Sequence, residues 1–220
     1  MSHDAPRPQC VYRVCFSFPL LFRVGEGYTW ELMRISGGTW CGRKLRAPAG
    51  DKVRPTQDRV REAIFSMLMS VVPEAAFLDL YAGSGAVGLE ALSRGAGRVT
   101  WVEKEARHVA VLKGNLALLA PEAVCEVACA DVSRWVKSAG RGRGFDVVFA
   151  DPPYELTRGQ GFAGLMAALA ENDVVAARGF FVAEMAADAC QAAEVPGWSL
   201  LRDRTYGHTR VALYRREARG

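Results

Sequence analysis

From about residue 56 onward, short apolar runs alternate with amphipathic segments along the chain. Seven runs have the length and composition of buried strands, at 77–81, 99–102, 123–130, 145–150, 179–184, 198–205 and 209–214. Near-continuous apolar strands separated by helices predict an α/β fold with a doubly wound, mostly parallel sheet. The last two runs flank Gly207 and predict a closing antiparallel pair, so we expect seven strands with an antiparallel last strand.

Five helices are expected, one before the first strand and four between the strands. The first follows Arg54-Pro55-Thr56, with Thr56 as N-cap, and ends near Pro73. Its apolar face is formed by Val60, Ile64, Phe65 and Leu68. The other four are expected at 86–94, 104–119, 133–138 and 161–171.

The first part of the chain has weaker patterns. Residues 1–32 contain no convincing element, and we predict a disordered extension or upstream sequence translated ahead of a true start at Met33. Short β-like pieces around glycines after Met33 predict a small hairpin whose turns carry Arg43 and Lys44. We therefore divide the chain into the extension 1–32, a hairpin and helix at 33–72, and the doubly wound domain at 73–220.

Composition indicates a globular cytoplasmic protein. Charged residues make up 24% of the chain, mean hydropathy is +0.02, and no apolar stretch approaches the roughly 18 residues of a transmembrane helix. The six cysteines form no Cys-x-x-Cys pair and no histidine lies at a zinc-like spacing from them, so no metal is expected. With Cys125 and Cys129 inside an apolar run, buried free thiols in a reducing compartment are the preferred interpretation.

Positive charge is concentrated near the start of the predicted globular part. Residues 33–61 contain eight basic residues and two acidic ones, although the whole chain has a net charge of only +4. The remainder is therefore slightly acidic. A basic front end indicates a polyanionic partner such as nucleic acid, with a solvated basic face as the alternative.

A glycine-rich turn follows the first strand of the domain. Gly83 to Gly88 matches G-x-G-x-x-G, and Glu103 lies 20 residues after Gly83, as in nucleotide-binding folds. This spacing alone leaves NAD, FAD and S-adenosylmethionine open. Asp79 favours S-adenosylmethionine among these three ligands, because its carboxylate would repel a pyrophosphate but suits a ligand with an amino group and a sulfonium. Asp131, after the third strand, is placed either to accept a hydrogen bond from adenine or to cap a helix.

The tetrapeptide Asp151-Pro152-Pro153-Tyr154 follows the fourth strand. Its two prolines fix the backbone and hold the Asp151 carboxylate and the Pro152 carbonyl rigidly. Two fixed acceptors can bind both hydrogens of an exocyclic amino group on a base and direct its lone pair at a methyl group. Tyr154 offers an aromatic face for a base taken out of its stack.

These motifs resemble the amino-directed class I methyltransferases, which have a Rossmann-like fold. More narrowly, the segments 33–45 (MRISGGTWCGRKL), 54–65 (RPTQDRVREAIF) and 78–96 (LDLYAGSGAVGLEALSRGA) resemble the RsmD family of bacterial rRNA guanine-N2 methyltransferases. The resemblance runs from Met33 to the C-terminus. The 32 residues before Met33 are the chief departure from the family.

The resemblance implies methyl transfer from S-adenosylmethionine to the N2 amino group of a specific guanine of 16S rRNA, within an assembled or assembling small subunit. The implied residues are Asp79, Ala82, Gly83, Ser84, Gly85, Glu103 and Asp131 for the cofactor, Asp151 to Tyr154 for the target base, and Arg34, Arg43, Lys44, Arg54 and Arg59 for RNA phosphates. Three alternatives remain: an adenine-N6 methyltransferase, a NAD-dependent oxidoreductase, and a non-catalytic nucleotide- or RNA-binding module. The pocket motif alone does not distinguish guanine from adenine.

Overall fold

The structure is a computed structural model that describes residues 33–47, 55–120, 122–153, 161–189 and 195–218. The expectations for the extension 1–32, for Arg54 and for Tyr154 therefore fall outside the described residues. The remaining predictions can be compared with the structure element by element.

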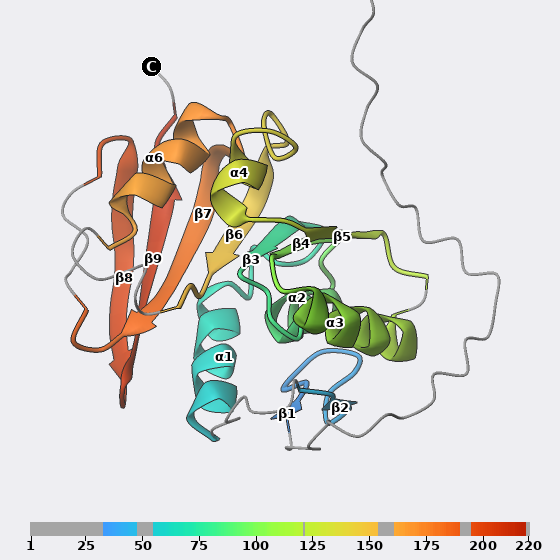
Figure 1. Cartoon of the computed structure of the whole chain (residues 1–220). Helices are drawn as coiled ribbons and strands as arrows, with labels where there is room; N and C mark the ends of the chain where they lie inside the picture. Colours follow the sequence, from blue (N-terminus) through green and yellow to red (C-terminus); the bar gives the residue numbers. More distant parts are fainter. Residues whose placement is uncertain (1–32, 48–54, 121, 154–160, 190–194, 219–220) are drawn as a thin grey trace, which may run out of the picture.

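One sheet of seven strands forms the centre of the molecule (Figure 1). Its order is β5-β4-β3-β6-β7-β9-β8, and only β9 runs antiparallel to its neighbours. The predicted mostly parallel sheet with an antiparallel last strand is confirmed. The strand bounds are β3 Ala76–Leu80, β4 Arg98–Glu103, β5 Cys125–Cys129, β6 Phe145–Ala150, β7 Val175–Ala186, β8 Trp198–Tyr206 and β9 Thr209–Arg216.

The winding of the sheet reverses between β3 and β6, which lie side by side although two other strands separate them in sequence. Chain segments leave the carboxyl ends of these two strands in opposite directions, so a crevice opens there. The glycine turn follows β3, and Asp151 follows β6. The sheet order thus brings the two main motifs to the same crevice.

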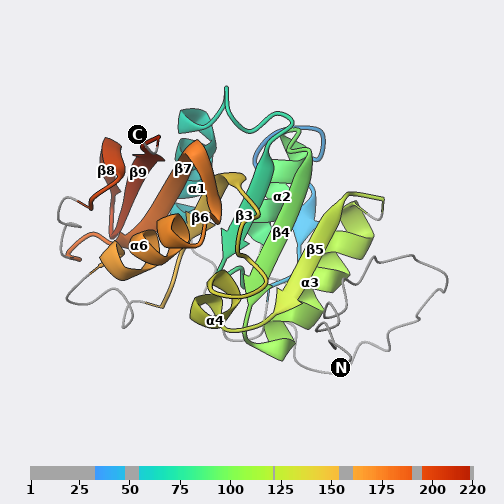
Figure 2. The ribbon, with the colours of Figure 1, turned by 90° about the horizontal axis from the view of Figure 1, so that it is seen from above.

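Helices cover both faces of the sheet and create two apolar cores (Figure 2). On one face, α1 (Pro55–Met67), α2 (Ala86–Ser93) and α3 (Ala106–Leu119) pack over residues such as Phe77 and Val147. On the other face, α4 (Val132–Val136) and α6 (Ala163–Glu171) pack over Leu78 and Val148. Because side chains alternate along a strand, Asp79 points to the same face as Phe77, towards α1 and α2.

The predicted hairpin is present and packs directly on the larger domain. It pairs β1 (Met33–Arg34) with β2 (Lys44–Leu45) in antiparallel register. Ile35 and Leu45 are buried in the core that α1 and α2 also share. The hairpin is therefore fixed to the helices beneath it by a common apolar contact.

A buried carboxylate reinforces this contact. Glu90 of α2 is 0% exposed and accepts hydrogen bonds from Ser36 N at 2.7 Å, Ser36 Oγ at 2.8 Å, Arg94 Nε at 2.8 Å and Arg61 Nε at 3.2 Å. Arg61 of α1 also donates to Asp58 and to the Arg34 carbonyl. One acid thus connects the hairpin, α1 and α2.

Several predicted boundaries are wrong. Helix α1 begins at Pro55, not after Thr56, and it ends at Met67 because the chain then enters turns in which Leu68 and Val72 are still buried. Strand β7 begins at Val175, four residues before the predicted start.

The predicted burial of the thiols is also wrong. Cys129 is exposed and Cys125 only half-buried, because β5 lies at the edge of the sheet. Both are free thiols, as expected. Within the described ranges, no helix combines the length and apolar character needed to cross a membrane.

Gly88 is required by packing between α2 and β4. A Cβ atom there would lie 2.2 Å from Nε1 of the fully buried Trp101. We expect Gly88→Ala to lower the free energy of unfolding by about 1–3 kcal/mol through overpacking.

Gly114→Ala is the matched control, because the nearest contact of a Cβ atom at Gly114 is the tip of Arg46 at 3.5 Å. Alanine in the middle of α3 should be neutral or stabilise by about 0.5–1 kcal/mol. Denaturant unfolding measures both, and equal stabilities would contradict the packing argument.

Candidate functional site

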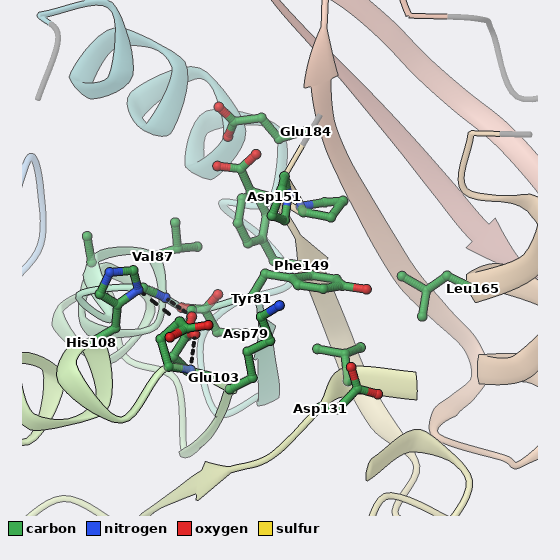
Figure 3. Close-up of a pocket in the computed structure, with 18 of the residues that line it drawn as sticks. Asp79, Tyr81, Val87, Glu103, His108, Asp131, Phe149, Asp151, Leu165 and Glu184 are labelled. Atoms are coloured by element: carbon green, nitrogen blue, oxygen red, sulfur yellow. Dashed lines mark hydrogen bonds and ion pairs between the residues drawn. The ribbon is translucent and has the colours of Figure 1, made fainter. Parts of the chain in front are cut away.

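A cavity of about 990 Å³ opens at the carboxyl ends of the central strands (Figure 3). Its volume lies at the upper end of the range for small-molecule sites in proteins. The glycine turn, the acids that follow β4 and β6, and residues of α1 and β7 all contribute to its wall. Of the residues assigned to the cofactor or the target base, those lining it are Asp79, Ala82, Gly83, Ser84, Glu103, Asp131, Asp151, Pro152 and Pro153.

The turn after β3 adopts the backbone that its glycines allow. Gly83 and Gly85 have φ values of 53° and 80°, in the left-handed region that favours glycine. A Cβ atom on Gly83 would meet nothing within 4 Å, so this glycine presents bare backbone to open space. At Gly85, by contrast, a Cβ atom would lie 2.6 Å from Leu112, so this glycine is required by the packing of α3.

Two carboxylates hold this turn in place. Glu103 accepts from the Gly83 N–H at 2.8 Å and from the Glu105 N–H at 2.8 Å, and Asp79 accepts from the Gly88 N–H at 2.9 Å. Both acids are more than nine-tenths buried, yet both line the cavity. Their first role is therefore to order the loop, and a ligand in the cavity would meet their remaining acceptor capacity.

Burial raises the pKa of Asp79 well above its usual value. The hydrogen bond from the Gly88 N–H acts in the opposite direction, and the nearby Asp151 and Glu103 carboxylates raise it further. A cationic group bound in the cavity would relieve this crowding of negative charge. A pyrophosphate would increase it.

Asp131 lies at the rim of the cavity, where it caps α4. Its carboxylate accepts from the Arg134 N–H at 3.0 Å, and its side chain is exposed. The capping role considered from the sequence is therefore present. A carboxylate has capacity for a further hydrogen bond towards the cavity.

Asp151, Pro152 and Pro153 continue β6 into the cavity wall. Asp151 is accessible to solvent through the cavity mouth, whereas Pro152 is buried. The protein atoms that surround the Asp151 carboxyl raise its pKa from 3.8 to about 7, because burial disfavours the charged form. This group can therefore exchange a proton near neutral pH.

Among the charged residues of the cavity wall that sequence reasoning missed are Glu184 of β7 and Arg61 of α1. Glu184 lies next to Asp151 in Figure 3 and has a raised pKa, caused first by burial and then by the Asp151 charge. A signal was available, since the predicted strand at 179–184 ends in this acid as its neighbours do. Arg61 gave no comparable signal, because it occupies an ordinary position among several basic residues.

The residues predicted to contact RNA lie near the cavity but outside it. Arg34, Arg43 and Lys44 are exposed on the hairpin, and Arg59 is exposed on α1. Met33 at the start of the hairpin lines the cavity itself. The exposed basic side chains therefore belong to elements that border the site.

Comparison with known proteins identifies the family. Residues 33–215 match a family described as Conserved hypothetical protein 95. Over 194 residues the chain is 37% identical to ribosomal RNA small subunit methyltransferase D of Escherichia coli K12, covering 86% of this chain and 92% of the relative. The chain belongs to the RsmD family.

Other family members agree with this assignment. The Haemophilus influenzae protein of the same name is 34% identical over 183 residues, covering 83% of this chain and 93% of the relative. The solved structure of Escherichia coli yhhF, which is 35% identical, superposes with a TM-score of 0.75, and the match covers 86% of this chain and all of that chain. The fold is thus the Rossmann-like methyltransferase fold, as the motifs indicated.

The raised pKa of Asp151 makes stability depend on pH. Between pH 3.8 and about 7 the folded protein retains a proton that the unfolded chain releases, so stability falls as pH rises through this range. An asparagine at position 151 has no titrating proton, so the Asp151→Asn variant should not lose stability in this way as pH rises. We expect the variant to exceed the wild type at pH 8 by on the order of 1 kcal/mol, a figure reduced because solvent reaches Asp151, and to show no gain below about pH 4.

Thermal unfolding at several pH values measures this difference. Glu184, Asp79 and Arg61 face the same region, and the pKa values of Glu184 and Asp79 should fall in the variant because the Asp151 charge is removed. Asp188→Asn, at an exposed position after β7, is the control and should follow the wild type throughout. Parallel curves for Asp151→Asn and the wild type would show that the pKa of Asp151 is not raised.

Proposed function

We propose that this protein transfers a methyl group from S-adenosylmethionine to the N2 amino group of a guanine in 16S rRNA of the small ribosomal subunit. The observation that carries the proposal is the single cavity that joins the glycine turn to Asp151 and the two prolines. A methyl donor and a methyl acceptor must meet in one enclosed space. The names of the relatives, ribosomal RNA small subunit methyltransferase D, support the choice of substrate.

The residues that line the cavity suit the charge of S-adenosylmethionine. The exposed backbone at Gly83 allows close approach, and the acidic groups of Asp79 and Glu103 suit a ligand that carries an ammonium and a sulfonium. Asp131 at the rim is available to the adenine amino group. When bound, this cofactor supplies an electrophilic methyl group on sulfur.

The residues after β6 act on the acceptor. The amino group of guanine is a weak nucleophile because its lone pair is delocalised into the ring. The Asp151 carboxylate and the Pro152 carbonyl accept its two hydrogens and favour a pyramidal nitrogen. With a pKa of about 7, Asp151 is also suited to take the proton that the amine loses.

A transfer assay tests this proposal. The protein is incubated with methyl-labelled S-adenosylmethionine and, separately, with small subunits lacking the modification, naked 16S rRNA and DNA. Nucleoside analysis by mass spectrometry should find N2-methylguanosine in the RNA of the subunits. Label found only as N6-methyladenine, or in no substrate, would defeat the proposal.

Two substitutions separate cofactor binding from transfer. We expect Asp151→Ala to bind S-adenosylhomocysteine normally but to reduce the transfer rate by about 10²-fold or more, because the acceptor loses its fixed hydrogen-bond partner. Glu103→Ala should weaken S-adenosylhomocysteine binding by about tenfold or more, since the Gly83 and Glu105 N–H groups lose their shared acceptor. Calorimetry and transfer assays measure the two effects. An Asp151→Ala enzyme with full activity would refute the assigned role.

The basic hairpin provides the proposed RNA contact. The double variant Arg43→Ala/Lys44→Ala should weaken binding to 16S rRNA and reduce the slope of log affinity against log salt by about 2, because two phosphate contacts are lost. Arg202→Ala/Arg204→Ala, on the exposed face of the remote strand β8, is the charge-matched control. Equal losses in both double variants would indicate a general charge effect without a contact surface on the hairpin.

A further inference from the structure

Two acids occupy equivalent places at the ends of neighbouring strands. Ala150 of β6 and Ala183 of β7 are register partners in the parallel part of the sheet. Asp151 and Glu184 each follow one residue later, so their side chains project to the same face from strands about 4.8 Å apart. Figure 3 shows the two carboxyl groups beside each other in the cavity.

Within the residues that the structure describes, the pair takes no part in holding the protein together. In the described part of the chain no hydrogen-bond donor contacts either carboxylate, unlike Glu103, whose two oxygens both accept from backbone N–H groups. Both carboxyl groups line the cavity, and the Asp151 charge raises the pKa of Glu184. Two unpartnered acceptors side by side fit a ligand that presents two donors side by side.

Guanine presents such an edge and adenine does not. The N1–H and the N2 amino group of guanine are adjacent donors, whereas adenine has an amino donor beside N1, which is an acceptor. An ionised carboxylate accepts from the guanine N1–H and repels the N1 lone pair of adenine. Recognition of this atom therefore separates the two bases that the motif at Asp151 alone does not distinguish.

We propose that Glu184 is a specificity-determining residue that accepts a hydrogen bond from N1–H of the target guanine while Asp151 accepts from its amino group. The inference rests on the proposed function and deepens it. It assigns to β7 the choice of guanine over adenine.

Burial and the Asp151 charge raise the pKa of Glu184 well above its usual value, and one neighbour, Arg61, acts towards the ionised form that accepts from the guanine N1–H. Arg61 of α1 lines the same cavity and lowers the pKa of Glu184 by attraction, against the effects of burial and of Asp151. The Arg61 guanidinium is itself held by Glu90, by Asp58 and by the Arg34 carbonyl. These contacts hold the positive charge of Arg61 in place beside the cavity, where it attracts the carboxylate of Glu184.

The test uses 2-aminopurine, which keeps the amino group at position 2 but carries a lone pair in place of the N1–H. The methylated guanine is first located in wild-type reactions by mass spectrometry, and subunits are then reconstituted with guanine or 2-aminopurine at that position. We expect the wild-type enzyme to prefer guanine by about 10- to 100-fold in kcat/KM, as for a hydrogen bond to a charged group. Glu184→Gln can donate to the lone pair, so its preference should fall by about tenfold or more.

Glu171→Gln, an exposed acid at the end of α6 and outside the cavity, is the matched control and should keep the wild-type preference. Circular dichroism and S-adenosylhomocysteine binding check that Glu184→Gln is folded. Equal rates on both bases with the wild-type enzyme would overturn the inference without recourse to any variant, as would an unchanged preference in a folded Glu184→Gln. A wild-type enzyme that makes no N2-methylguanosine would instead refute the proposed function.

Discussion

The arrangement of the molecule depends on one buried carboxylate, that of Glu90. A fully buried carboxylate is stable only when its hydrogen-bonding capacity is met, and removal of one partner from such a group typically costs several kcal/mol. The partners of Glu90 come from the hairpin, from α1 and from α2 itself. The exposed basic residues of the hairpin and the wall of the cavity are therefore held in one fixed relation.

The acids of the cavity divide by what they do for the backbone. Glu103, Asp79 and Asp131 each accept from main-chain N–H groups, so they build the loops in which they lie. Asp151 and Glu184, by contrast, accept from no donor among the described residues. Acidic residues at successive strand ends thus include both structural groups and groups left available for recognition.

The sequence predicted those features that depend on local pattern. Strand β6 was predicted to the residue, because its apolar run ends at an acid and two prolines. The start of β7 was missed since Arg178 has a φ of 64° and the register with β6 shifts there, which interrupts the regular strand pattern. The edge position of β5, and hence the exposure of Cys129, depends on strand order, which an apolar run alone does not encode.

Long-range partners account for the rest of what could not be foreseen. Glu90 reads as an ordinary polar residue of a helix, and its partner Ser36 lies 54 positions away in the chain. The sequence shows Glu184 as a fourth acid at the end of a predicted strand. That Glu184 lies next to Asp151, however, follows only from the register of β6 with β7. Patterns of adjacent residues predict elements, whereas pairs across the sheet require the fold.

The contact between Trp101 and the glycine turn has a spectroscopic consequence. The indole N–H of Trp101 donates to the Gly85 carbonyl at 3.3 Å, and its ring packs against Gly88 while fully shielded from solvent. The emission of a buried indole depends on the polarity and hydrogen bonding around it. The protein therefore carries, among its five tryptophans, one buried indole whose emission depends on the conformation of the ligand loop that it contacts.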